Sequence, residues 1–276
     1  MEILPAIAGW LWVKEGFLLF RKKPVELTTL FLTYVFLMLG ICIIPIIGKI
    51  AAMVLVPTFS IGFLQACLHV ERGEPITQIH LFAGFKSPAR KSLLKLGVVY
   101  LSAAIFAIAV SSVIDGGMLW DFMTGQKIPK ENDLQLPNTQ QAILFAMCTY
   151  NLIAVLLWFT APLVGWKNMP VSKAIFYSFF SVFRTLKCFI AYGLSWLAIA
   201  IATMLAASIS AIMLGALIGT EQAQTPVALA LLIASAISSL VSYCAVYRSY
   251  AQVFGLEIMS PELEPEPKPE PPNDQS

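Results

Sequence analysis

Histidine and cysteine are the residue types of this chain that could hold a metal ion or a haem. His69 lies near the end of an apolar stretch and His80 in the segment that follows, so the two imidazoles are not expected at one depth on opposing helices. The 5 cysteines include no Cys-x-x-Cys pair and give no disulfide framework. Cys42 and Cys148 both lie toward the outer leaflet and could meet at the periplasmic side of the membrane. We therefore predict no metal site and no cofactor, and interpret the cysteines as small apolar residues.

Motifs of the common enzyme classes do not occur in the sequence. There is no His-Glu-x-x-His, no Gly-x-Ser-x-Gly, no phosphate-binding loop and no dinucleotide-binding fingerprint. Asp115-Gly116-Gly117 is better explained as a turn than as a catalytic group. The apolar stretches carry no Asp or Glu in their middle, so a carboxylate relay for protons or sodium is unsupported. We predict that the protein is not an enzyme.

A few polar residues and prolines do interrupt the apolar stretches. Asn151 lies within one of them and is expected to make an interhelical hydrogen bond, while Arg248 is expected to extend its side chain to the membrane surface. Pro57 and Pro162 remove backbone hydrogen bonds, and kinks there could shape a cavity. Asn151, Pro57 and Pro162 together mark a candidate pathway for a solute.

Six long apolar stretches must position all of these residues. The chain is 58% hydrophobic and 12% charged, against about 25% charged residues in soluble proteins. About 20 apolar residues in a helix cross a bilayer, and a helix satisfies its own backbone hydrogen bonds in lipid. The sequence therefore predicts an all-α membrane protein with six transmembrane helices arranged as three hairpins. The stretches lie at residues 27–47, 50–70, 93–114, 141–166, 188–218 and 227–247.

The lysines and arginines indicate the orientation of these helices. Of the 18 basic residues, 15 fall in segments that six crossings place on one side of the membrane. Only Lys49, Lys127 and Lys130 fall on the other side. Because basic residues stay on the cytoplasmic side of a membrane, we predict that both termini lie in the cytoplasm.

Aromatic and basic residues alternate just before the first, third and fifth stretches. Segments of this composition can lie in the membrane interface, with rings among the acyl chains and cations among anionic headgroups. The three segments are either a duplicated unit or the separate result of the same interfacial requirement. The predicted lipid-interface residues are Trp10, Trp12, Arg21, Lys22, Lys23, Lys86, Arg90, Lys91, Arg184 and Lys187.

The chain divides by composition into three parts. Residues 1–24 form a cytoplasmic interfacial amphipathic segment, 25–256 form the transmembrane domain, and 257–276 form a Pro/Glu-rich cytoplasmic tail predicted to be disordered. Small residues recur every four positions in three crossings, which lets helices approach closely. The fifth and sixth crossings should therefore pack as an antiparallel pair. The small-residue rows are Ala103, Ala107 and Ser111; Ala198, Ala202, Ala206 and Ser210; and Ala234, Ser238 and Ser242.

Several short motifs resemble those of a known family. They are Gly-Trp-Leu-Trp-Val-Lys at 9–14, Gly-Phe-Leu-Leu-Phe-Arg-Lys-Lys-Pro at 16–24, Pro57 followed by Gly62, the loop at 81–86, Trp-Phe-Thr-Ala-Pro-Leu-Val at 158–164, and Phe183-Arg184. The chain resembles an uncharacterised family of betaproteobacterial six-helix inner-membrane proteins over most of its length except the tail. The resemblance implies an inner-membrane location and brings no catalytic residues with it.

The function expected from the residues is a non-enzymatic membrane component that organises lipid or a partner complex. Its expected partners are anionic lipid headgroups on the cytoplasmic side, with a protein partner or a second copy of the chain left open and no nucleic acid. The alternative is a carrier or channel for an apolar or weakly polar solute. A haem- or quinone-binding redox protein is the third hypothesis.

Overall fold

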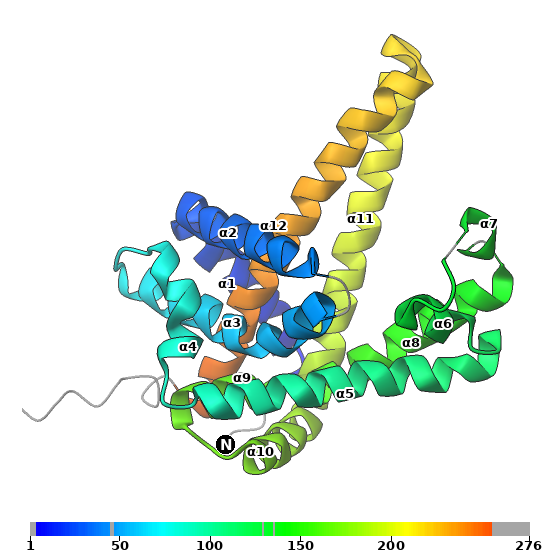
Figure 1. Ribbon diagram of the computed structural model, residues 1–276. Coiled ribbons are helices and arrows are strands. Elements are labelled where there is room, and N and C mark those ends of the chain that lie inside the picture. Colours follow the sequence, from blue (N-terminus) through cyan, green and yellow to red (C-terminus); the bar gives the residue numbers. More distant parts are fainter. Residues whose placement is uncertain (1–3, 45–46, 129, 135, 256–276) are drawn as a thin grey trace, which may run out of the picture.

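The regular elements of the described part of the chain are helices. The computed structural model describes residues 4–44, 47–128, 130–134 and 136–255, and within these ranges it contains no strand (Figure 1). The predicted disordered tail, 257–276, lies outside the described residues. The all-α fold class predicted from the sequence is confirmed.

Six helices of the described chain are long and apolar enough to cross a membrane, as the sequence predicted. Their ends fall within five residues of the predicted stretches except for the sixth, whose helix α12 extends seven residues farther at each end. They are α2 (Pro24–Cys42), α3 (Ile47–Arg72), α5 (Arg90–Asp115), α8 (Pro137–Leu156) with α9 (Thr160–Lys167), α11 (Leu186–Ile218) and α12 (Thr220–Phe254).

Shorter helices precede the first, third and fifth crossings. α1 (Ala8–Lys22) and α10 (Val171–Arg184) are long enough to present two faces, whereas the middle segment folds only as η1 (Gln78–Phe82) and α4 (Ala83–Lys86). The three segments therefore differ in length. Two further helices, α6 (Met118–Thr124) and α7 (Glu131–Leu134), lie in the loop between α5 and α8.

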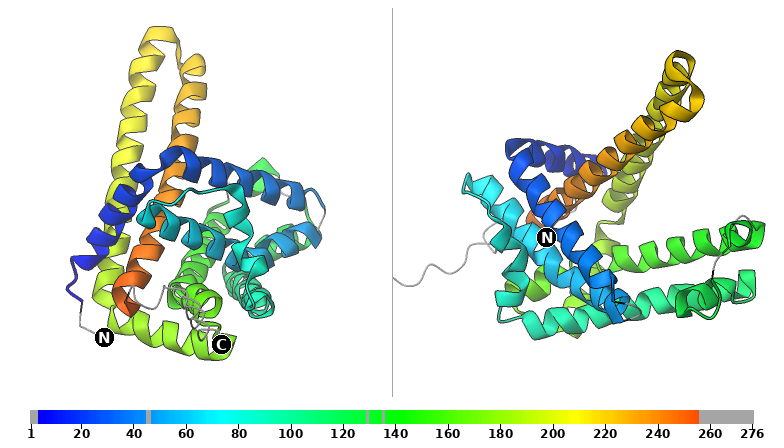
Figure 2. Two further views of the ribbon diagram at one scale, coloured as in Figure 1. Left: turned by 90° about the vertical axis from the view of Figure 1, so that its left-hand side faces the viewer. Right: turned by 45° about the horizontal axis from the view of Figure 1, so that its top comes forward.

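The hairpins diverge from a common base. In Figures 1 and 2 the α5–α8 and α11–α12 hairpins point in different directions away from the region that holds α1, α4, α9 and α10, which we call the basic end. The largest buried side chains, among them Trp12, Phe63, Phe159 and Tyr247, lie near this end of their helices. The protein core thus sits at the basic end, while the outer half of α11 is exposed.

Helix α1 lies directly against the α11–α12 hairpin because two glycines allow it. A Cβ atom at Gly9 would stand 2.0 Å from the Cys188 carbonyl oxygen of α11, and one at Gly16 would stand 2.9 Å from the Val241 carbonyl oxygen of α12. Both contacts are with backbone atoms that cannot move aside. Any side chain at either position would therefore push α1 away from the hairpin.

The fourth crossing is interrupted where α8 gives way to α9. Pro162 lacks an N–H group, and the chain forms turns at residues 157–159 before the helix resumes. The Ser178 hydroxyl of α10 accepts from Phe159 N–H at 3.1 Å and donates to the Leu156 carbonyl at 2.8 Å. Tyr100 donates to the Leu157 carbonyl at 3.3 Å. The break is therefore satisfied by protein side chains, whereas α3 continues through Pro57.

The small-residue row of α11 faces outward, whereas the sequence predicted that it would pack against α12. Ala103, Ala107 and Ser111 are buried in α5, consistent with close packing, but Ala198, Ala202, Ala206 and Ser210 are exposed on α11. The less exposed side of α11 is the adjacent row of Ile199, Thr203, Ala207 and Ala211. The antiparallel pairing of α11 with α12 is present, but the predicted α11 row does not form it.

Replacing Ser178 with alanine should destabilise the protein. The change removes the hydroxyl that serves both Phe159 N–H and the Leu156 carbonyl, and leaving buried backbone groups without a partner costs about 1–3 kcal/mol. Thermal unfolding in detergent should start at a lower temperature than in the wild type. Ser208→Ala is the matched control, since its hydroxyl bonds only within exposed α11. Equal melting temperatures for the two variants would contradict the bridging role.

Oxidation with iodine should join Cys67 of α3 to Cys244 of α12. Both side chains are buried and their Sγ atoms lie 3.5 Å apart, close enough to form a disulfide with a small rotamer change. The measurement uses a protein in which Cys42, Cys148 and Cys188 are replaced by serine. After oxidation, this protein is alkylated in denaturant to block free thiols, then reduced, and the released thiols are tagged with a maleimide polymer. Two tags should appear after oxidation and none in the further variant Cys67→Ser. Free thiols throughout would show that α3 and α12 do not pack this way.

Candidate functional site

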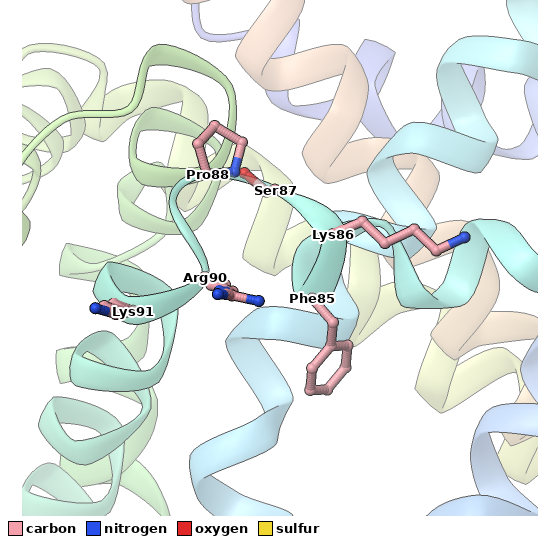
Figure 3. Close-up of a pocket in the computed structure, with 6 residues that line it drawn as sticks. All are labelled: Phe85, Lys86, Ser87, Pro88, Arg90 and Lys91. Atoms are coloured by element: carbon pink, nitrogen blue, oxygen red, sulfur yellow. The ribbon is translucent and has the colours of Figure 1, made fainter.

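A basic pocket forms at the turn between α4 and α5. It has a volume of about 500 Å³ and brings together three of the predicted lipid-interface residues (Figure 3). Lys86, Arg90 and Lys91 are all exposed, and within the described chain no carboxylate pairs with them. The lining residues are Phe85, Lys86, Ser87, Pro88, Arg90 and Lys91.

Local hydrogen bonds fix the backbone of this turn. Ser87 N–H donates to the Ala83 carbonyl at 3.0 Å and ends α4, and Arg90 N–H donates to the Ser87 carbonyl at 3.1 Å as α5 begins. The Ser87 hydroxyl accepts from Ala89 N–H at 3.1 Å. Gly84 anchors α4 on α3, because a Cβ atom there would lie 2.2 Å from the Thr58 carbonyl oxygen. The cations therefore project from a well-fixed turn.

The three cations fan out along the surface. In Figure 3 the Lys86 and Lys91 side chains extend in opposite directions, and Arg90 lies between them beside Phe85. A fanned arrangement does not enclose one small anion. It matches instead a surface that presents several negative charges, such as the headgroup layer of a membrane.

Helix α10 adds an aromatic surface at the same end of the protein. Its small residues Ala174, Ser178 and Ser181 are buried, so its aromatic side chains point outward. Arg184 is the last residue of α10, where the negative pole of the helix favours a cation, and Lys187 lies in the first turn of α11. An exposed aromatic face beside cations is typical of a helix that lies in the membrane interface. The exposed rings are Phe176, Tyr177, Phe179, Phe180 and Phe183.

Helix α1 presents only part of the surface predicted for it. Trp10 is 45% exposed and Arg21 and Lys22 are exposed, whereas Lys23 donates to the Glu74 carbonyl at 2.9 Å. The prediction is wrong for Trp12, which is 1% exposed and donates through Nε1 to the Gln252 side chain at 2.5 Å. Two residues along a helix turn a side chain by about 200°, so Trp12 faces the protein when Trp10 faces outward.

A charged cluster joins three helices and was missed by the sequence reasoning. Arg248 of α12 donates through Nε to Glu15 of α1 at 3.0 Å and through Nη1 to Glu71 of α3 at 2.5 Å. The Tyr247 hydroxyl also donates to Glu71. The expectation that Arg248 extends to the membrane surface did not include these two carboxylates, which hold a side chain that stays 27% exposed. The available signal was the presence of Glu15 and Glu71 near the same membrane side as Arg248.

The two histidines lie together, contrary to the sequence expectation. Their ring centroids are 4.5 Å apart, since the loop after α3 folds η1 back against it. His69 Nδ1 pairs with Glu74 at 2.5 Å, and His80 Nδ1 accepts from Thr77 N–H at 3.0 Å to cap η1. In the part of the chain that the structure describes, no three His, Cys, Asp or Glu side chains are placed to hold a metal.

The candidate solute pathway is not assembled. Asn151 is exposed and donates to the Met147 carbonyl of its own helix at 2.8 Å, so the predicted interhelical bond is wrong. It lines an apolar cavity of about 290 Å³ between α3, α5, α6 and α8. Pro57 of α3 and Pro162 of α9 are buried and do not line this cavity.

Replacing Arg248 with methionine should destabilise the junction of α1, α3 and α12. It leaves Glu15 and Glu71 without their cation, and hydrogen bonds to charged groups contribute about 1.5–3 kcal/mol each. Thermal unfolding should show the loss, and Lys95→Met, an exposed site on α5, is the control. Adding Glu71→Gln to Arg248→Met should cost less than the two changes measured separately. Strict additivity would contradict a direct interaction.

Comparison with known proteins places the chain in a family. It is 31% identical over 259 residues to a probable inner membrane protein of Burkholderia thailandensis, a match that covers 91% of this chain and 93% of that protein. No protein-family model matches the chain, and no solved structure matches it. Together with the six apolar helices, the match establishes a multi-pass inner-membrane protein. The chain belongs to the same family of bacterial inner-membrane proteins as this Burkholderia protein.

Proposed function

We propose that this protein is a non-enzymatic component of the inner membrane that binds anionic phospholipid at its basic end and so organises lipid or a partner complex. The observation that carries the proposal is the basic pocket, where Lys86, Arg90 and Lys91 project without carboxylate partners in the described chain. Each cation near an anionic surface contributes about 1 kcal/mol. Three together favour anionic over zwitterionic lipid.

The aromatic face of α10 supports the same function. α10 packs against α5, the helix that starts at the basic pocket, so the two surfaces belong to one end of the protein. Exposed phenylalanines can insert among acyl chains while Lys86, Arg90 and Lys91 reach phosphates. This division of apolar and cationic contacts is what a phospholipid requires.

A carrier for an apolar solute is the second candidate. The cavity at Asn151 is lined mostly by apolar side chains, and interrupted helices such as α8–α9 often surround transport sites. However, Ser178 and Tyr100 already bond to the backbone groups freed by the interruption. Those groups are not available to a solute, which favours the lipid-binding function.

The test is a matched pair of triple variants of the full chain. In one, Lys86, Arg90 and Lys91 become glutamine; in the other, Lys49, Lys127 and Lys130 become glutamine, which changes the net charge equally at the opposite end. Native mass spectrometry with phosphatidylglycerol and phosphatidylcholine measures the preference for the anionic lipid. The first triple should lose this preference by about tenfold or more, and the second should retain it.

Equal preference in the wild type and both triples would contradict the proposal. A loss in the second triple alone would place the anionic-lipid contact at the opposite end of the helices. A preference lost equally in both triples would mean that net charge, and not the basic pocket, attracts the lipid.

A further inference from the structure

Helix α1 and the α11–α12 hairpin border a shallow, open groove with two lobes, away from the basic pocket. The first lobe has a volume of about 440 Å³ between α1, α11 and α12, and the second has about 510 Å³ along α11. Trp10 and Ile199 line both lobes, so Trp10 stands between them. The groove adjoins helices that cross the membrane, where phospholipid is the solvent.

The walls of the groove are mostly apolar and carry one charged side chain. Phe17, Trp196 and Val241 line the first lobe, and Lys14 is the charged residue among its lining side chains. Lys14 is exposed, and no ion pair of the described chain involves it. Its neighbour Glu15 does not neutralise it, because Glu15 pairs with Arg248.

One face of α1 alternates rings and cations along this groove. Trp10, Lys14, Phe17 and Arg21 follow one another at spacings of four, three and four residues, which places them on the same side of a helix. The Arg21 guanidinium lies 5.9 Å from the centre of the Phe17 ring. Cations held between rings at the membrane surface are suited to a phosphate group with acyl chains below it.

Small side chains of α11 and α12 keep the groove open. Ala198 and Ala202 line the second lobe, and their small side chains leave it open. Ser238 of α12 does the same in the first lobe. Larger residues at these positions would fill the space, whereas Ala206, farther along the same row, lines neither lobe.

We propose that this groove holds one anionic phospholipid, with its phosphate on Lys14 and its two acyl chains on either side of Trp10. The site is separate from the basic pocket and shares no residue with it. It binds a single lipid molecule, whereas the basic pocket contacts the headgroup layer. Loss of one site therefore leaves the other measurable.

Native mass spectrometry of the full chain with added phosphatidylglycerol tests the site. Lys14→Gln should weaken the most tightly retained lipid by about fivefold, the effect of one cation near a phosphate. Ala198→Phe should displace it by filling the second lobe. Lys95→Gln, an exposed cation of α5 outside the groove, and Ala206→Phe, on the same row of α11, are the controls and should retain it.

A phosphatidylglycerol with a diazirine in its acyl chain gives a second measurement on the wild type. Adducts should concentrate at residues 194–202 and 237–241. Adducts spread evenly over all crossings, or equal retention in Ala198→Phe and Ala206→Phe, would overturn the proposal. If the basic-pocket triple variant loses its lipid preference while these results are negative, the proposed function stands and the groove site does not.

Discussion

The pairing of Arg248 with two carboxylates is the interaction on which the basic end of the protein depends. A charge within a membrane protein is costly unless it is paired, and Arg248 has Glu15 and Glu71 on two different helices. Glu15 can reach it only if α1 lies across α12, and Glu71 only if the end of α3 lies beside the same turn. One guanidinium thus determines how three elements meet.

The position of α1 has consequences for the surface that the protein offers to lipid. Gly9 and Gly16 bring α1 into backbone contact with the hairpin, and Trp12 is buried between them. The neighbouring, exposed face of α1 then carries Trp10 and Lys14, which line the groove beside the hairpin. In a membrane, burying apolar surface between helices contributes little to the free energy of helix association, because lipid tails are apolar as well. Close backbone contacts and polar bonds therefore contribute more to holding α1 in place.

The crossings were predictable from the sequence because each depends only on a local run of apolar residues. Local sequence also predicted the interruption near Pro162, and it predicted the exposure of Lys86, Arg90 and Lys91. Features that depend on helix rotation were not: Trp12 and the α11 row from Ala198 both point the other way from the prediction.

Contacts between distant residues were the other part that the sequence could not supply. Arg248 meets Glu15 across 233 positions, and no local pattern states which cation meets which carboxylate. His69 and His80 are close in sequence, yet their contact depends on how the loop between them folds. Composition identifies which residues are polar near the membrane surface, but only the packing of α1, α3 and α12 shows which of them are partners.

The lipid that surrounds the protein in its own membrane tests the central claim most directly. The protein would be extracted with a styrene–maleic acid polymer, which takes a disc of native bilayer with it, and the lipids of the disc compared with those of the whole membrane. The account predicts enrichment of anionic phospholipid in the disc. A disc with the same proportion of anionic lipid as the whole membrane would contradict it.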